Sequence, residues 1–454
     1  MVLDADVQRL EQGRTLLGGD PGRLLRLTPD GSRGLEQLAH GRPVDERVRV
    51  LARTLLDGGL AHPRPAPVPR FADVVVVVPV RDRAQELERC LAALGREAPV
   101  LVVDDGSRDP AAVAAVCRRA GADVLALPVN AGPAAARNAG LAATGSALVA
   151  FVDSDCLPPA GWLAALAGHF ADPLVAAVAP RVRGSVSGGT GRAAVARARS
   201  PLDLGDHEAR VRPGSRVPYV PTAALVVRRA ALPAPPFDAG LRYGEDVDLV
   251  WRLHDAGWTV RYDPRTVVQH TEPERWRDRL VRRYRYGTSA GPLAVRHGAR
   301  VTPLVASPVV LLAWSLLASG RPVRALAVAG VPAVSLHRAL RATGLPTRDC
   351  ARTALRVTGQ GVRATAAGLG GAGSVVTAPV LLALLLLRRT RRTAAVALLV
   401  PPLLERRGRR LEVGPVRWTA VRLVDDLAYA LGVWRGAWAA RTTAPLRPRR
   451  TRPR

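Results

Sequence analysis

The chain has 454 residues, 48% of them hydrophobic, a composition that excludes an intrinsically disordered protein. Its formal net charge is +28, but residues 1–270 hold 33 Arg against 30 acidic residues, whereas residues 271–454 hold 33 Arg against 8. Because this basic excess lies among apolar runs, it favours an anionic membrane surface and argues against nucleic acid as a partner. The four cysteines have no C-x-x-C spacing, which argues against a disulfide framework or a zinc site.

Residues 1–69 predict a small domain that ends in a linker. Its expected elements are strands at Arg14–Leu17 and Arg23–Leu27 and helices at Gly34–His40 and Val44–Leu60. Four prolines within residues 61–69 oppose a helix or a central strand, so this stretch is expected to be a stiff spacer. The first ten residues carry three charges and no apolar core, so we expect no signal peptide and a cytoplasmic location.

Residues 70–270 alternate between strand and helix patterns. Val74–Val78 is an unbroken β-branched run, as expected for a parallel strand that is buried on both faces. The other expected elements are strands at Val100–Val103, Val124–Leu127 and Ala147–Val152 and helices at Ala84–Leu94, Pro110–Ala120 and Ala134–Thr144. This order predicts an α/β domain with a Rossmann-like, mostly parallel sheet and a site at the carboxyl ends of its strands.

Residues 271–454 contain four apolar runs, at Val301–Ala318, Ala325–Leu336, Val375–Leu387 and Ala394–Leu404. Only the first approaches the ~18–20 residues that cross a bilayer, and the others are short or interrupted by proline. The run 388–392 contains four arginines, which is typical of a cytoplasmic anchor. We therefore expect a helical, basic region that associates with the inner face of the cell membrane.

Three motifs at strand ends are candidates for chemistry, and Asp104-Asp105-Gly106 is the first. It follows a predicted strand, where carboxylates can accept hydrogen bonds from a base or a ribose and the glycine lets a ligand approach the backbone. A simple helix N-cap is the alternative for the motif taken alone. Further along the chain, Arg137 and Asn138 lie in the first turns of the predicted helix Ala134–Thr144, and the arginine could pair with diphosphate oxygens or be solvated on an Ala-rich helix.

The second motif, Asp153-Ser154-Asp155, ends an apolar strand and is the candidate metal site. Mg²⁺ and Mn²⁺ take hard oxygen ligands and keep positions open for phosphate oxygens. His270 closes a strand-like run at Arg265–Gln269, and its imidazole is a candidate third ligand or a structural residue. An ordinary acidic loop is the alternative for the Asp pair.

The third motif, Gly244-Glu245-Asp246, opens a predicted helix. A carboxylate at a helix N-terminus is stabilised as an anion by the helix dipole, which suits a general base that accepts a proton from a hydroxyl. Asp248 is expected to be an ordinary residue of the first helical turn.

These motifs together resemble family 2 glycosyltransferases of the GT-A fold. The matching segments are Val78-Pro79, Asp104-Asp105-Gly106-Ser107, Asn130-x-Gly132, Ala136-Arg137-Asn138-x-Gly140, Asp153-x-Asp155 and Glu245-Asp246, all in the expected order. The resemblance implies inverting transfer from a nucleotide-diphosphate sugar with Mg²⁺ or Mn²⁺.

Carried over by the resemblance, Asp246 is the base and Asp155, with Asp153, holds the metal and the diphosphate. Glu245 is assigned beside Asp246 as a catalytic residue, and His270 is the candidate third metal ligand named above. The donor would be bound by Pro79, Asp104, Asp105, Arg137, Asn138 and Asp153. The segment Arg81-Asp82-Arg83 departs from the family pattern, which puts donor contacts near Asp82 in doubt. No QxxRW motif is present, so processive polymerisation is not supported.

The layout of the whole chain is similar to that of the mycofactocin-system glycosyltransferases. Residues 1–69 resemble small winged-helix-like peptide-recognition domains. The resemblance implies a bacterial enzyme that transfers glucose from UDP-glucose to a redox cofactor derived from a ribosomal peptide, or to its precursor. Two alternatives stay open: transfer to a lipid-linked or cell-wall glycan, and a non-catalytic scaffold that binds a nucleotide sugar.

Overall fold

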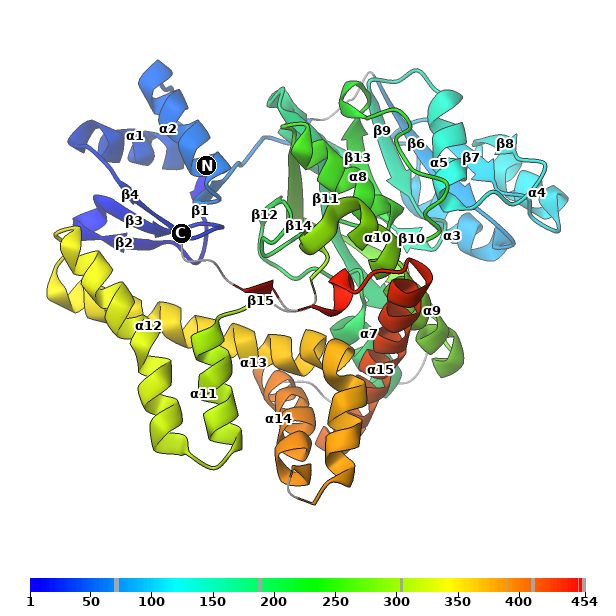
Figure 1. Cartoon of the computed structure of the whole chain (residues 1–454). Coiled ribbons are helices and arrows are strands. Elements are labelled where there is room, and N and C mark those ends of the chain that lie inside the picture. The colour runs from blue at the N-terminus through cyan, green and yellow to red at the C-terminus, as the bar shows by residue number, and fades with distance from the viewer. Residues whose placement is uncertain are drawn as a thin grey trace. The chain divides into compact units, whose positions relative to one another are not determined.

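The computed structural model describes residues 1–68, 73–186, 190–302, 305–388, 390–409, 413–447 and 449–450 (Figure 1). It divides into two compact units, one of residues 1–188 and 196–272 and the other of residues 189–195 and 273–454. The predicted boundary between residues 69 and 70 and the chain end at 451–454 lie outside the described residues.

The first unit begins with a small α+β domain. Its elements are β1 (Val2–Leu3), β2 (Gln8–Leu10), β3 (Thr15–Gly18), β4 (Arg23–Arg26), α1 (Pro29–Ala39), α2 (Glu46–Asp57) and β5 (Ala61–His62). Strands β2, β3 and β4 form an antiparallel sheet, and β1 pairs with β5. Helix α1 begins five residues earlier than expected, because Thr28 caps it by accepting from the backbone N–H of Gly31 at 3.0 Å and proline follows at its first position.

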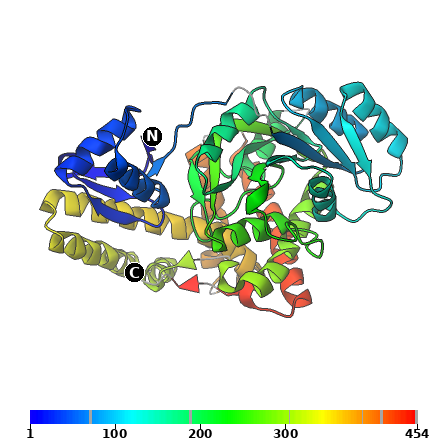
Figure 2. The same ribbon diagram turned by 90° about the horizontal axis from the view of Figure 1, so that it is seen from above.

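A parallel sheet forms the next part of this unit. Its strands β9 (Leu148–Val152), β6 (Val74–Val80), β7 (Val100–Asp104) and β8 (Asp123–Ala126) lie in that order. The intervening helices are α3 (Ala84–Leu94), α4 (Pro110–Ala120) and α5 (Pro133–Ala142) (Figures 1 and 2). Nearly all of β6 is buried, as its β-branched sequence predicts for a strand covered on both faces.

The sheet continues with strands of which the sequence patterns revealed only part of one, the run Arg265–Gln269. β13 (Ala224–Arg228) pairs antiparallel with both β9 and β11 (Val175–Ser185), and β11 runs parallel to β14 (Thr259–Thr271). Short strands β10 (Cys156–Leu157) and β12 (Ala209–Val211) pair antiparallel with β14. The remaining helices here are α6 (Trp162–Ala167), α7 (Thr190–Arg199), which lies across the division between the units, and α8 (Glu245–Asp255). The mixed α/β architecture with parallel central strands confirms the predicted fold class.

Ion pairs connect the small N-terminal domain to the sheet domain within the first unit. Arg53 pairs with Asp172 at 2.8 Å, and Arg64 with Glu208 at 2.7 Å. Both pairs are partly shielded from solvent, so they are screened less than fully exposed pairs.

The second unit is mainly helical. Its long helices are α9 (Trp276–Thr288), α10 (Ala290–His297), α11 (Pro308–Ala318), α12 (Pro322–Ala342), α13 (Thr347–Leu386), α14 (Arg391–Arg409) and α15 (Pro415–Ala439), and β15 (Val305–Ala306) pairs with β16 (Arg449–Arg450). The expectation that Val301–Ala318 is the run nearest to bilayer length was wrong, since α11 covers only its last 11 residues. In the described part of the chain, one helix, α12, is long and apolar enough to cross a bilayer. Proline lies inside α12 and α14 without ending either helix.

Glycines bring α15 against α9 and α10. A Cβ at Gly287 would lie 2.3 Å from the Tyr429 carbonyl oxygen, and one at Gly432 would lie 2.0 Å from that of Tyr284. One turn further along, Gly291 and Gly436 make equally close backbone approaches. Only residues without a side chain permit such spacing, so this contact depends on glycine.

Candidate active site

The first motif lies where β7 ends. Asp104 and Asp105 are both buried, and the carboxylate of Asp105 accepts from the backbone N–H groups of Ala131 and Gly132 at 2.7 and 2.9 Å. At Gly106 the backbone has φ +66°, and a Cβ would lie 2.6 Å from the backbone nitrogen of Asn130. The two Asp residues and the loop that begins at Asn130 therefore form one packed edge, as expected of a site at strand ends.

Strand β6 ends beside this motif. Its Pro79 is opposite Val103 in the sheet register, so it lies near the same edge. Asp82 has φ 54° and accepts from the backbone N–H of Arg108 at 2.7 Å, which is the first cause of its lowered pKa. The departure from the family pattern at Asp82 thus has a structural use, because its carboxylate ties two loops of this edge together.

Asp153 and Asp155 follow β9 at this edge. Asp155 is buried and lies 2.5 Å from Nη1 of Arg83, whereas the side chain of Asp153 is one-third exposed. Buried Cys90 and Cys156 lie behind the motif, and burial and the two carboxylates raise the pKa of both thiols. Arg83 entered the sequence analysis only as a departure from a pattern, since its contact with Asp155 joins residues 72 apart.

Arg137 joins the second and third motifs. Its Nη2 donates to Asp153 Oδ1 at 2.6 Å and its Nη1 donates to Glu245 Oε1 at 2.8 Å. Burial alone would lower the pKa of Arg137, but the carboxylates of Asp153 and Glu245 outweigh burial and raise it. The guanidinium is therefore a permanent buried cation that holds two acidic clusters together.

The side-chain amide of Asn138 is hydrogen-bonded to backbone groups and is not left unbonded at the strand-end edge. Its Nδ2 donates to the carbonyl of Phe237 at 2.7 Å and its Oδ1 accepts from the N–H of the same residue at 3.1 Å. The ring of Phe237 also lies under the Arg137 guanidinium, 5.7 Å from its centroid to Cζ. Phe237, which the sequence analysis missed, thus supports both residues, and no sequence signal marks it.

The third motif opens helix α8. Gly244 adopts φ 85°, which ends the preceding loop and lets the helix begin at Glu245. Glu245 is buried, and Asp246 is partly exposed and accepts from the backbone N–H of Val247 at 2.8 Å. Burial, followed by the neighbouring Glu245 carboxylate, raises the pKa of Asp246 to about 7. Oδ2 of Asp248 accepts a hydrogen bond from Nε of Arg252 at 2.8 Å, and this contact is consistent with a structural role for Asp248.

His270 lies next to Asp155. The two residues are brought together by the pairing of β10 with β14, and His270 Nε2 lies 3.6 Å from Asp155 Oδ1. On its other side, Nδ1 lies 3.5 Å from Oε1 of Glu272, which is also buried. Glu272 was not predicted; it follows the last residue of β14, two positions after His270.

Carboxylates and imidazole are donors that Mg²⁺ and Mn²⁺ accept, so the set of Asp153, Asp155 and His270 fits a divalent ion by its chemistry. Within the described residues, no three acidic, His or Cys side chains lie close enough together to hold a metal ion in this arrangement. The cation beside Asp155 here is Arg83, whose side chain is nearly half exposed and has room to move.

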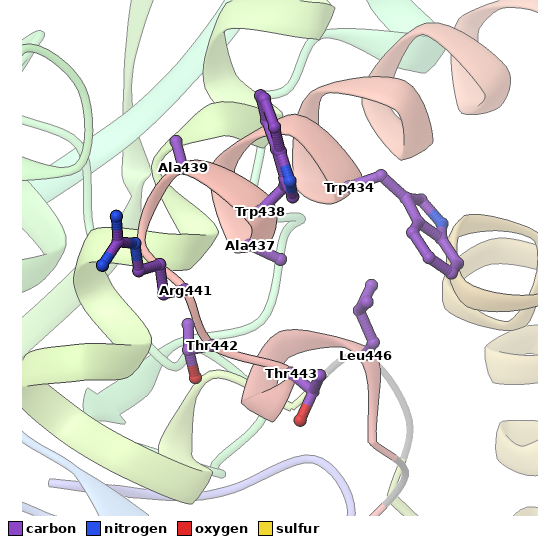
Figure 3. A pocket seen from close by; sticks show the side chains of 8 residues that line it. All are labelled: Trp434, Ala437, Trp438, Ala439, Arg441, Thr442, Thr443 and Leu446. Carbon is purple, nitrogen blue, oxygen red and sulfur yellow. The ribbon is translucent and has the colours of Figure 1, made fainter.

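A pocket of about 620 Å³ lies in the helical unit and contains none of the predicted site residues. Its lining comes from the end of α15 and the residues after it (Figure 3). The side chains of Trp434, Trp438 and Leu446 make this lining largely apolar. The pocket is not assigned to the chemistry of the acidic motifs.

Comparisons with known proteins show the family of the chain. The glycosyl transferase family 2 model matches residues 75–232. The chain is 42% identical to the pre-mycofactocin glycosyltransferase of Mycobacterium tuberculosis (strain H37Rv) over 465 residues, covering 98% of this chain and 96% of that protein. It is 34% identical to glycosyltransferase AglE of Haloferax volcanii over 99 residues, covering 20% of this chain and 33% of that protein.

Among solved structures, the mannosyltransferase PcManGT from Pyrobaculum calidifontis, in complex with GDP-Man and Mn²⁺, aligns with a TM-score of 0.41 and 19% identity, covering 83% of this chain and 94% of that one. The identification rests instead on the relative matched at 42% identity over nearly the full length of both chains. The chain belongs to glycosyl transferase family 2 and, within it, to the pre-mycofactocin glycosyltransferases.

Proposed function

We propose that this protein transfers glucose from UDP-glucose to mycofactocin or its peptide-derived precursor, with inversion at the sugar carbon. The observation that carries the proposal is the Arg137 bridge, with hydrogen bonds of 2.6 and 2.8 Å to Asp153 and Glu245. The bridge supports the proposal because it joins Asp153, for which we propose a role at the donor diphosphate, to the helix that carries the proposed base, Asp246. The similarity to the pre-mycofactocin glycosyltransferase of Mycobacterium tuberculosis supports the acceptor class.

In this proposal each acidic motif has one task. Asp104 and Asp105 bind the nucleoside, with Pro79 beside them, and Arg137 and Asn138 shape the edge near the diphosphate. Asp246 accepts the proton of the acceptor hydroxyl, whose oxygen then bonds to the anomeric carbon while the bond to the nucleoside diphosphate breaks. Asp153, Asp155 and His270 would hold Mg²⁺ or Mn²⁺, which when bound stabilises the negative charge of the departing diphosphate.

We also propose that the protein acts in the cytoplasm at the inner face of the membrane. Helices α11 and α12 form a hairpin (Figure 1) that exposes large apolar side chains, among them Val323 and Leu326, which are 80% and 77% exposed. Arg321 and Arg324 lie at the turn of this hairpin. Exposed apolar side chains flanked by cations are suited to an anionic lipid surface.

The experiment that tests the transferase proposal follows release of nucleoside diphosphate from several sugar nucleotides by purified full-length protein with Mn²⁺ or Mg²⁺. We expect release from UDP-glucose that EDTA stops, and glucosylation of the peptide-derived acceptor.

Asp246→Asn should bind UDP-glucose like the wild type but transfer about 10²–10⁴-fold more slowly, because it removes only the base. Asp155→Ala should lose metal-dependent donor binding.

The same assays decide between the alternatives. Transfer to a lipid-linked glycan but not to the peptide-derived acceptor would contradict the proposed acceptor. Donor binding with no transfer to any acceptor would point to a non-catalytic scaffold. Failure to bind any sugar nucleotide would exclude both the transferase and the scaffold.

A further inference from the structure

Residues 212–223, between β12 and β13, connect the N-terminal domain to the edge that carries the acidic motifs. All of these elements belong to the first unit. Val217 and Val220 within the segment are completely buried, and the backbone N–H of Arg212 donates to the Val217 carbonyl at 3.3 Å. The segment is therefore packed and internally bonded, unlike a loose surface loop.

The N-terminal domain holds the first part of this segment through Arg216. Nη2 of Arg216 donates to Asp6 at 2.7 Å, Nη1 donates to Asp4 at 3.3 Å, and its backbone N–H donates to Asp20 at 2.6 Å. Asp4 is buried and is itself hydrogen-bonded to Nε2 of His62 at 2.9 Å. Three carboxylates from two separate turns thus converge on Arg216. They hold the orientation of this residue and also balance the charge of its guanidinium.

Elements of the active site hold the second part. Nε1 of Trp251, on the helix that begins with Glu245-Asp246, donates to the Pro218 carbonyl at 2.7 Å. The backbone N–H of Asp153 donates to the Ala223 carbonyl at 3.0 Å. The segment therefore makes a direct hydrogen bond to each of the two elements that Arg137 joins.

We infer that residues 212–223 couple the N-terminal domain to the active site, with Arg216 as the positioning residue. By holding Arg216, the N-terminal domain fixes the segment, and the segment fixes the backbone of Asp153 and the helix that carries Asp246. Other ion pairs between the same two parts, among them Arg64 to Glu208 and Arg53 to Asp172, lie outside the segment. Whatever binds the N-terminal domain near Asp4, Asp6 and Asp20 would then affect catalysis without touching the substrate.

Hydrogen–deuterium exchange of the full chain tests this coupling without an acceptor. Wild type is compared with Arg216→Ala, with Arg216→Lys, which keeps the charge and the backbone N–H, and with the control Arg64→Ala. We expect several-fold faster exchange at 148–157, 217–226 and 245–253 in Arg216→Ala. Arg64→Ala should match the wild type at these peptides, and Arg216→Lys should lie close to it.

Faster exchange confined to residues 1–20 and 212–216 would overturn the coupling. If Arg216→Ala does not fold, Asp6→Asn removes one of the three carboxylate charges, and unchanged exchange at 217–226 and 245–253 in that variant would count against the inference in the same way. Once transfer is established, which rests on the proposed function, Arg216→Ala should lower kcat with an unchanged Kd for UDP-glucose, and a wild-type kcat would contradict the positioning role. The exchange result stands even if the donor or acceptor is different.

Discussion

Arg137 shows how one buried side chain organises this active site. Its side chain is only 4% exposed, yet it contacts carboxylates from two separate motifs and the ring of Phe237. A buried cation is stable only when it is paired, and the two carboxylates meet that requirement while the cation limits their mutual repulsion. The same residue therefore contributes to folding and to the arrangement of the catalytic carboxylates.

Replacing Arg137 should destabilise the folded protein. We expect Arg137→Ala to lower the free energy of unfolding by about 3–5 kcal/mol, because Asp153 and Glu245 lose their buried partner. The control is Arg119→Ala, which removes an ion pair between Arg119 and Glu88. Both of these side chains are more than half exposed, so this substitution should lower the free energy of unfolding by at most about 1 kcal/mol. Urea denaturation of both variants measures the difference, and equal costs would contradict the role assigned to the bridge.

The raised pKa of Asp246 predicts how transfer depends on pH. A base must be ionised to accept a proton, and burial and Glu245 raise the pKa of Asp246 to about 7. kcat/KM should therefore fall about tenfold per pH unit below pH 7 and level off above it. A profile from pH 5 to 9 measures this.

The variant Glu245→Gln, measured over the same pH range, tests the contribution of the Glu245 charge to the raised pKa of Asp246. Removing the neighbouring negative charge should move the fall of kcat/KM to lower pH. A wild-type kcat/KM that stays level down to pH 5 would contradict the raised pKa of Asp246, since an ordinary aspartate titrates near pH 4.

At the scale of elements, the contact of α15 with α9 and α10 depends on small residues. A Cβ on Gly436 would lie 2.3 Å from the Thr288 carbonyl oxygen, so Gly436→Ala must push the helices apart. We expect a loss of about 1–3 kcal/mol or more in stability. Gly359 of α13 is exposed and a Cβ there would meet nothing within 4 Å, so Gly359→Ala should instead stabilise its helix by up to about 1 kcal/mol. Thermal unfolding of the two variants checks the opposite signs.

The boundaries of the elements show which local signals are reliable. Helices α3 and α4 begin and end at the residues expected from the sequence, since an apolar periodicity and terminal glycines or proline mark them. Strands β11 and β13 were not predicted, although they lie inside the sheet. β11 mixes alanine and proline with valine, and β13 is only five residues long, so their strand conformation depends on pairing with β14 and β9.

At the scale of the whole molecule, the α11–α12 hairpin predicts binding to anionic lipid. Leu326→Glu should weaken co-sedimentation with vesicles that contain anionic lipid several-fold, because it removes apolar area and adds a charge that the surface repels. Val50→Glu is the control, since Val50 is also exposed, at 59%, but lies in the N-terminal domain. Binding should fall with salt, because Arg321 and Arg324 act through screened attraction. Equal binding by both variants would contradict the assignment to this hairpin.

The amino-acid sequence by itself determined the fold class, the strand-end position of the acidic motifs and the family resemblance. These depend on patterns within about ten residues, such as the β-branched run of β6 or the glycine that follows Asp104-Asp105. Tertiary structure decided which motifs meet. The bridge from Arg137 to Glu245 joins residues 108 apart, and Arg216 reaches Asp6 across 210 residues. No local pattern encodes such pairs, because they arise only when the packed sheet brings separate strand ends and turns to one edge.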